Sequence, residues 1–313
     1  MRLRSRASGL AATAVSAVVA LLAAACSPGT TVSPASSSSG VIVAVGAENE
    51  YANVISQIGG RYAQVTAIES NPNTDPHTFE ASTSVARVIA TAQLVVQNGL
   101  GYDSFMDRME AGSPSSSRKV IDVQSLLGLP DNTPNPHLWY APGTMPAVAK
   151  AIAADLAAIR PSGRAYFQGR LRAFDRSLQP WRRAIAHLRA AYPATPVAVT
   201  EPVGDYLLQA AGARILTPFT LQADIMNGVD PAPQQVSLEN NLLCRHQVRV
   251  FAYNQQVVDS LTGSFLAAAQ RCGIPVVGVY ETMPTGYDYQ SWMMAETGAL
   301  LKAVTSRQST EKL

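Results

Sequence analysis

The feature that most constrains this fold is an alternation of short apolar runs with helical segments, which begins near Val41. In the first half of the chain, strands are expected at residues 41–45, 62–68, 94–97 and 119–123, and helices at 51–58, 85–92, 104–109 and 146–159. Continuous apolar strands separated by helices are typical of a parallel sheet with helices on both faces. The first half therefore predicts an α/β lobe.

A long helical segment interrupts this alternation after Pro161. Its apolar residues recur at alternating spacings of four and three and so share one helix face: Phe167, Leu171, Phe174, Leu178, Trp181, Ile185 and Leu188. Pro180 lies inside the segment and is expected to kink it. A coiled-coil dimer is the alternative interpretation. We favour a connecting helix within one chain, because the seam is short and both neighbouring segments are α/β.

The alternation resumes in the second half of the chain. Strands are expected at 197–200, 248–253 and 274–280, and helices at 205–211, 233–243, 260–270 and 291–304. The predicted fold is α/β, with two lobes built on parallel central sheets flanked by helices and joined by one long helix. The corresponding boundaries are 41–160 for the N-terminal lobe, 161–192 for the connecting helix, 193–306 for the C-terminal lobe and 307–313 for a tail.

The N-terminus has the pattern of an export signal. Three arginines precede an apolar run over residues 10–25, which is short for a membrane span. The sequence Leu22-Ala-Ala-Ala-Cys26 resembles a lipobox, although Ala23 stands where leucine is usual. We therefore expect a signal peptide over 1–25, acylation of Cys26 and a flexible Ser/Pro-rich tether over 26–40. The expected location is the outer face of the cytoplasmic membrane. Simple cleavage, leaving a soluble secreted protein, is the alternative.

The charge of the mature chain excludes some partners. Residues 1–25 hold three arginines and no acid, so their removal turns 24 basic and 22 acidic residues into 21 against 22, or −1. A nearly neutral body gives no electrostatic reason for binding nucleic acid or an anionic membrane surface. We expect a monomer whose membrane attachment depends on the lipid alone.

Two of the three cysteines lie in matching places. If Cys26 is acylated, Cys244 and Cys272 remain as an even pair in an exported protein. Each precedes a predicted strand, so the two sulfurs would meet if those strands are parallel neighbours. We expect a disulfide; two separate buried thiols are the alternative.

Two histidines occur in the same local setting, Asp75-Pro76-His77 and Asn135-Pro136-His137. The chain has four histidines in all, and each of these two follows a predicted strand and a loop. Glu201 and Glu281 come directly after strands. Because ligands of open α/β sheets bind at the carboxyl ends of the strands, these four residues are expected to converge. Two imidazoles and two carboxylates, two from each lobe, predict a divalent transition-metal site in the cleft between the lobes.

Each of these residues also has an ordinary interpretation. A loop histidine is commonly solvated, and a glutamate after a strand can simply adjoin a helix N-cap. The repeated Pro-His context favours ligands for the first pair. His187 lies off the apolar seam of its helix and His246 lies in an arginine-flanked loop, so we expect both at the surface.

Four segments resemble the metal-site segments of the zinc/manganese solute-binding proteins of ABC importers. They are Asp75-Pro-His-Thr-Phe-Glu80, Asn135-Pro-His-Leu-Trp139, Thr200-Glu-Pro-Val-Gly-Asp-Tyr206 and Glu281-Thr-Met-Pro284. The segment 228–236 also resembles a loop of that family, and the likeness in order and spacing covers about residues 41–305.

The resemblance implies two lobes hinged on a rigid helix, with the metal between them and a permease as partner. The ligands it implies are His77, His137, Glu201 and Glu281. The family normally carries aspartate at the last position, so Glu281 departs from the pattern, and its longer side chain could bind bidentately or shift the metal. The family's usual proline is also missing from the segment 79–84.

The donor set leaves two metals open. Two imidazoles with two carboxylates lean toward Mn²⁺, whereas Zn²⁺ accepts the same donors and generally binds more tightly. Residues 124–136 contain no histidine-rich loop.

Two other functions are alternatives. A metal-dependent hydrolase could use the same site, but four protein ligands would close it, and no HExxH, nucleophile elbow or phosphate-binding glycine loop is present. A surface adhesin on this scaffold is the third possibility. We expect a carrier and not an enzyme.

Overall fold

The computed structural model describes residues 40–73 and 75–313, and within these ranges it contains two four-stranded sheets. The predicted signal peptide, Cys26 and all of the predicted tether except Gly40 lie outside the described residues. Among the described helices, none combines the length and apolar character that crossing a bilayer requires.

The first sheet belongs to the N-terminal lobe and is entirely parallel, with the order β2-β1-β3-β4. Its elements in chain order are β1 (Ile42–Glu48), α1 (Asn49–Gly59), β2 (Ala63–Glu69), α2 (Thr83–Thr91), β3 (Leu94–Gln97), α3 (Phe105–Gly112), β4 (Lys119–Asp122), α4 (Val123–Leu127) and α5 (Thr144–Ile159). The strand order reverses direction between β1 and β3, which is the point where open α/β sheets bind ligands.

The C-terminal lobe repeats the same topology with the order β6-β5-β7-β8. Its elements are β5 (Pro196–Val199), α8 (Asp205–Ala210), β6 (Arg214–Ile215), α9 (Phe219–Met226), α10 (Pro233–Cys244), β7 (Val250–Asn254), α11 (Ser260–Arg271), β8 (Val276–Val279) and α12 (Tyr289–Ser306). The predicted fold class, two lobes with parallel sheets flanked by helices, is confirmed.

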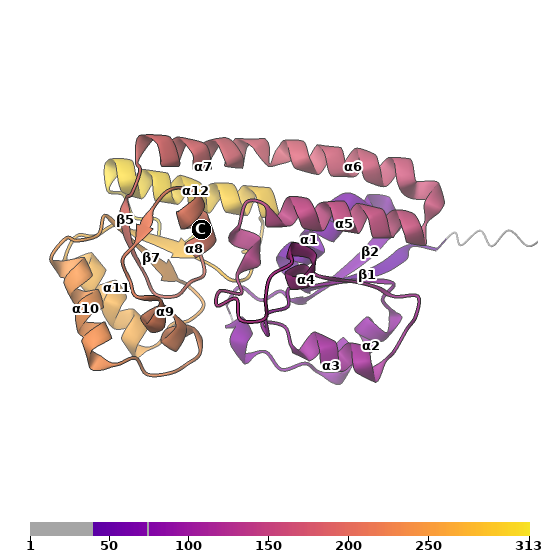
Figure 1. The fold of residues 1–313 in the computed structure, drawn as a ribbon, viewed down its shortest axis with the longest axis horizontal. Helices are drawn as coiled ribbons and strands as arrows, with labels where there is room; N and C mark the ends of the chain where they lie inside the picture. The colour runs from indigo at the N-terminus through magenta and orange to yellow at the C-terminus, as the bar shows by residue number, and fades with distance from the viewer. Residues whose placement is uncertain (1–39, 74) are drawn as a thin grey trace, which may run out of the picture. The chain divides into compact units, whose positions relative to one another are not determined.

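Both faces of the first sheet are buried, as its continuous apolar strands predict. Along β1, Ala44 packs with α1 and α5, whereas Val45 packs with α2 and α3 on the opposite face (Figure 1). The cluster that contains Ala44 continues into the second lobe through Val199 and Val277. The two lobes therefore share one hydrophobic core on the side of the connecting helices.

The connecting segment consists of two helices, α6 (Arg164–Ser177) and α7 (Gln179–Ala191), which run nearly in line (Figure 1). The helix is interrupted at Leu178, as expected from Pro180, which cannot donate a backbone hydrogen bond. The seam residues from both helices pack into the shared core. Trp181 also donates from Nε1 to Thr297 Oγ1 of α12 at 2.9 Å. The seam therefore serves packing within the chain.

Two elements of the second lobe were not predicted. β6 has only two residues, too few to give a periodic signal, and α9 follows Pro218 with no polar N-cap residue. The predicted tail is also ordered against the sheet. Thr310 pairs in parallel with Val277, donating to Val276 O at 2.8 Å and accepting from Gly278 N at 2.9 Å.

The turn from β1 into α1 depends on a glycine. A Cβ placed on Gly46 would collide with the backbone of Ala52, so glycine lets α1 fold back closely on its strand. This close approach fixes the start of α1, at Asn49, at the carboxyl end of the sheet.

Candidate metal centre

The two histidines are positioned by the same local device. Asp75 Oδ1 accepts the backbone N–H of His77 at 2.8 Å, and Asn135 Oδ1 accepts the backbone N–H of His137 at 3.0 Å. In each case the intervening proline fixes the backbone between the acceptor and the histidine. The repeated Asx-Pro-His pattern is therefore a turn that directs an imidazole away from the loop, once in 76–78 and once just before 138–140.

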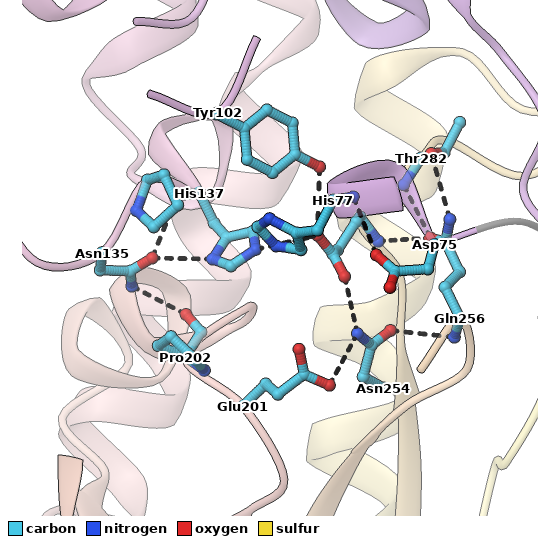
Figure 2. A network of polar contacts seen from close by, with 12 residues as sticks. Asp75, His77, Tyr102, Asn135, His137, Glu201, Pro202, Asn254, Gln256 and Thr282 are labelled. Atoms are coloured by element: carbon cyan, nitrogen blue, oxygen red, sulfur yellow. Dashed lines mark hydrogen bonds and ion pairs between the residues drawn. The ribbon is translucent and has the colours of Figure 1, made fainter. Parts of the chain in front are cut away.

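The two glutamates come from strand ends of the other lobe. Glu201 follows β5 by two residues, and Glu281 follows β8 by two residues. Asn254, the last residue of β7, lies between them. Its Nδ2 donates to Glu201 Oε1 at 3.1 Å and to Glu281 Oε1 at 2.8 Å (Figure 2). One amide therefore sets the position of both carboxylates.

Three of the four predicted ligands converge on a single point. Glu281 Oε2 lies 3.1 Å from His77 Nε2 and 3.2 Å from His137 Nε2. The donor atoms of these three residues all lie within 4.8 Å of one another. Donors around a tetrahedral zinc ion are roughly 3.3 Å apart, because each lies about 2.0–2.1 Å from the metal. The observed spacing is thus close to that of a metal shell.

Glu201 lies outside this group of three. Its side chain is buried, its Oε1 accepts from Asn254, and its Oε2 has no hydrogen-bond partner among the described residues. Burial, followed by the charge of Glu281, raises the pKa of Glu201 well above its ordinary value. A buried carboxylate oxygen without a partner, beside the three donors, is suited to bind a cation.

The tautomer of His137 follows from its neighbours. Asn135 Nδ2 donates to the carbonyl of Pro202 at 2.7 Å, so the oxygen of the same amide faces His137 Nδ1, at 2.8 Å. That oxygen can only accept, which makes Nδ1 the donor and leaves the lone pair of Nε2 in a neutral ring directed at Glu281. In this tautomer Nε2 lies 3.2 Å from Glu281 Oε2, and either a proton or a metal ion between the two atoms would stabilise the pair.

Burial and charge set the protonation of the three donors. The side chains of Glu281 and His137 are fully buried, whereas His77 keeps 22% of its side chain exposed. Burial lowers the pKa of His137. Burial also opposes protonation of His77, but a hydrogen bond and the charge of Glu281 outweigh it and raise the pKa of His77. Burial would raise the pKa of Glu281, but the two histidines hold it far below its ordinary range.

A second group of acids is buried in the N-terminal lobe near this site. Glu48 and Glu69 are paired residues of β1 and β2, and Glu50 lies in the first turn of α1. Their carboxylate oxygens have no hydrogen-bond partner among the described residues, apart from a proton that Glu48 can share with Asp103. Burial first, and then repulsion from Asp103 and the neighbouring glutamates, raises the pKa of Glu48 and brings that of Glu69 to about 9. Glu69 is therefore mostly protonated at neutral pH.

The sequence did not predict the supporting roles of several residues. The positions of Asn254 and Asn135 in the sequence could have indicated their roles, since Asn254 ends a strand and Asn135 precedes a Pro-His pair. Tyr102, whose hydroxyl donates to Glu281 Oε2 at 3.1 Å, comes from the turn after β3 and has no such signal. His187 and His246 are exposed, as predicted.

The fold and the site together describe a two-lobed α/β protein in which imidazoles from one lobe meet carboxylates from the other, a group of side chains that could hold a metal ion. Residues 45–303 match the family described as zinc-uptake complex component A, periplasmic. Since the match covers well over half of the sequence, the chain belongs to this family, as the resemblance of its metal-site segments predicted.

One curated relative matches part of the chain. A Thermotoga maritima protein described as metal-binding is 32% identical over 94 residues, which are 30% of this chain and 33% of that protein. The chain thus aligns with about a third of that relative's length.

Solved structures extend the likeness to the whole fold. The periplasmic zinc-binding protein TroA from Treponema pallidum has a TM-score of 0.72 at 16% identity, covering 85% of this chain and 99% of its own. FpvC from Pseudomonas aeruginosa, solved with Mn²⁺, has a TM-score of 0.68 at 22% identity, covering 86% and 99%. At these identities the likeness establishes the fold.

Proposed function

We propose that this protein captures a divalent transition metal, Zn²⁺ or Mn²⁺, outside the cytoplasmic membrane and delivers it to the permease of an ABC importer. Membership in a periplasmic zinc-uptake family supports the transport role. The similar structures TroA, described as zinc-binding, and FpvC, solved with Mn²⁺, support a divalent transition metal as the cargo. The hydrolase and adhesin interpretations find no support in these comparisons, and we propose a carrier without catalytic turnover.

The observation that carries the proposal is the close contact between the side chains of His137 and Glu281. A neutral imidazole directs its lone pair at a buried carboxylate, and a third donor, His77, is within bonding range of the same point. A divalent cation bound there would replace repulsion between lone pairs with three metal bonds. It would also join the lobes, because the imidazoles and the carboxylate come from different sheets.

We propose Glu201 as the fourth ligand. Its free oxygen Oε2 would bind the metal while Oε1 keeps the hydrogen bond to Asn254. Two nitrogen donors and two oxygen donors suit both candidate metals.

Metal analysis and competition calorimetry test the site. We expect about one equivalent of metal in protein purified without chelator, and binding of both Zn²⁺ and Mn²⁺ after chelation. X-ray absorption of the zinc form should show nitrogen and oxygen donors at about 2.0–2.2 Å from the zinc ion. His246→Ala, at the surface, is the control and should bind like the parent. Absence of binding to either metal, in folded protein, would contradict the proposal.

Delivery and anchoring need tests in cells. Deleting the gene should reduce metal uptake and cause a growth defect that excess metal rescues. We also propose that Cys26 is acylated after removal of residues 1–25 and that the protein acts as a monomer. Labelling with a fatty-acid analogue should mark the parent and not Cys26→Ser. Unchanged metal uptake in the deletion strain, without a redundant carrier, would refute the importer role.

A further inference from the structure

The segment that carries Glu281 is held from the opposite lobe by one side chain. Asn49, the first residue of α1, donates from Nδ2 to the carbonyl oxygen of Met283 at 2.8 Å. The backbone N–H of Met283 donates back to Asn49 Oδ1 at 2.9 Å. A single amide thus satisfies both backbone groups of a residue two positions after the metal-site glutamate.

The same segment is held from its own lobe as well. Gln256 Oε1 accepts the backbone N–H of Glu281 at 2.6 Å and that of Thr282 at 2.8 Å. The Glu281–Met283 segment therefore lies between two amide side chains, one from each lobe. Gln256 fixes it to the sheet that contains β8, and Asn49 fixes it to the lobe that contains both histidines.

The chemistry of this contact is specific to asparagine. Its side chain offers one donor and one acceptor in a single plane, whereas aspartate offers two acceptors, one of which would face the Met283 carbonyl. Met283 is largely buried, so an unmatched backbone group there costs free energy. The adjacent Glu48 and Glu50 are buried, and no salt-bridge partner for either is found among the described residues.

We propose that Asn49 is a positioning residue for metal capture, which fixes the carboxylate of Glu281 relative to His77 and His137 across the boundary between the lobes. The inference rests on the proposed function, because it takes these three residues as metal ligands. Since Asn49 stands at the end of β1, where the strand order reverses, the strand that anchors the first lobe also positions a ligand from the second.

The test compares Asn49→Ala and Asn49→Asp with a matched control, Asn53→Ala. Asn53 lies one turn further along α1 and also contacts the other lobe, accepting from the backbone N–H of Tyr289 at 3.1 Å, but it does not touch the ligand segment. We expect the Asn49 variants to bind Zn²⁺ and Mn²⁺ about 10- to 100-fold more weakly, the usual effect of removing support from a metal ligand. The control should stay within about twofold of the parent.

A double-mutant cycle separates positioning from general destabilisation. If Asn49 acts through Glu281, Asn49→Ala should cause no further loss of metal affinity in a Glu281→Ala background. Equal losses with and without Glu281, parent-like affinity of Asn49→Ala, or an equal loss in Asn53→Ala would overturn the proposal.

A measurement on the parent protein covers the case in which the variants fail to fold. Hydrogen exchange at the Met283 amide should slow when Zn²⁺ is added, because metal binding and the Asn49 contact hold the same segment. Unchanged exchange would overturn the inference. Failure of the metal site itself is recognised separately, because His137→Ala would then bind metal like the parent.

Discussion

The two lobes have the same strand order but arrange their polar side chains at the sheet edge in opposite ways. In the C-terminal lobe each carboxylate follows its strand by two residues, and amides hold it: Asn254 bonds to Glu201 and Glu281, and Gln256 holds the backbone of Glu281. In the N-terminal lobe the equivalent edge carries Glu48 and Glu69 without such partners, and the imidazoles come from turns beyond it.

This difference shows that a shared topology fixes where a site lies and not which lobe supplies which charge. In the C-terminal lobe the two histidines hold the pKa of Glu281 low, whereas burial raises that of Glu201. The N-terminal lobe presents two imidazoles toward the cleft, and the pKa of its buried Glu69 is raised to about 9. A cation between the lobes is thus met by ligands of complementary kinds.

The largest expected effect tests whether the two imidazoles of the N-terminal lobe are equivalent. His137 is fully buried with both ring nitrogens engaged, whereas His77 is partly exposed, so water can replace only the latter ring easily. We expect His137→Ala to weaken metal binding about 1000-fold and His77→Ala about 100-fold, beyond the losses typical of supporting residues. Calorimetry measures both, and equal losses would show that burial does not rank these ligands.

The next largest effect is on stability and concerns the disulfide of the C-terminal lobe, which lies away from the proposed metal ligands. The structure joins Cys244 and Cys272, as the sequence predicted, across a separation of 28 residues. Replacing both by alanine should lower the free energy of unfolding by about 3.5 kcal/mol in the chain-entropy model. Because both cysteines precede strands while the ligands follow them, metal affinity should stay within about twofold. Denaturant titration and calorimetry decide this, and a large loss of affinity would mean that the two ends of the sheet are coupled.

A smaller effect on stability distinguishes buried acids that have hydrogen-bond partners from those that have none. The pKa of Glu69 is about 9, above its ordinary 4.5, so its contribution to stability falls as pH rises between these values. In chelator-treated protein, Glu69→Gln should raise the free energy of unfolding by on the order of 2 kcal/mol at pH 7, with little gain near pH 4.5.

Glu239 of the C-terminal lobe is the matched control for this comparison. Burial raises its pKa to about 8, but Thr217 Oγ1 donates to its carboxylate at 3.0 Å. Glu239→Gln should therefore stabilise less, because a hydrogen bond is disturbed. Urea denaturation at several pH values measures the free energy of unfolding of both variants. Equal increases in this free energy would remove the distinction between the lobes.

The smallest effect is the pH dependence of binding. His77 has a raised pKa and His137 a lowered one, so protons compete with metal first at His77, beginning above about pH 6.5. Affinity should fall about tenfold per pH unit once His77 is protonated. His77→Gln should bind weakly but with a flatter pH profile. A profile as steep as that of the parent would assign the competing proton elsewhere.

The sequence predicted the fold and the neighbourhood of the site because both depend on local patterns. Alternating strands and helices fix the sheets, and the strand-end rule places His77, His137 and Glu281 together. The same rule could not show that Glu201 stands outside the group of three, because that depends on Asn254 bonding to both carboxylates. Contacts across the lobes, such as those of Asn49 and Tyr102, require the packed structure and have no sequence period.

The buried acids also alter how this protein would behave in an electric field. The formal charge of +2 counts every aspartate and glutamate as ionised. Burial raises the pKa of Glu48 and Glu50, and brings those of Glu69, Glu239 and Glu296 to about 9, 8 and 8. Each proton retained adds one positive unit, so the folded chain should focus at a higher pH on a native isoelectric gel than in urea.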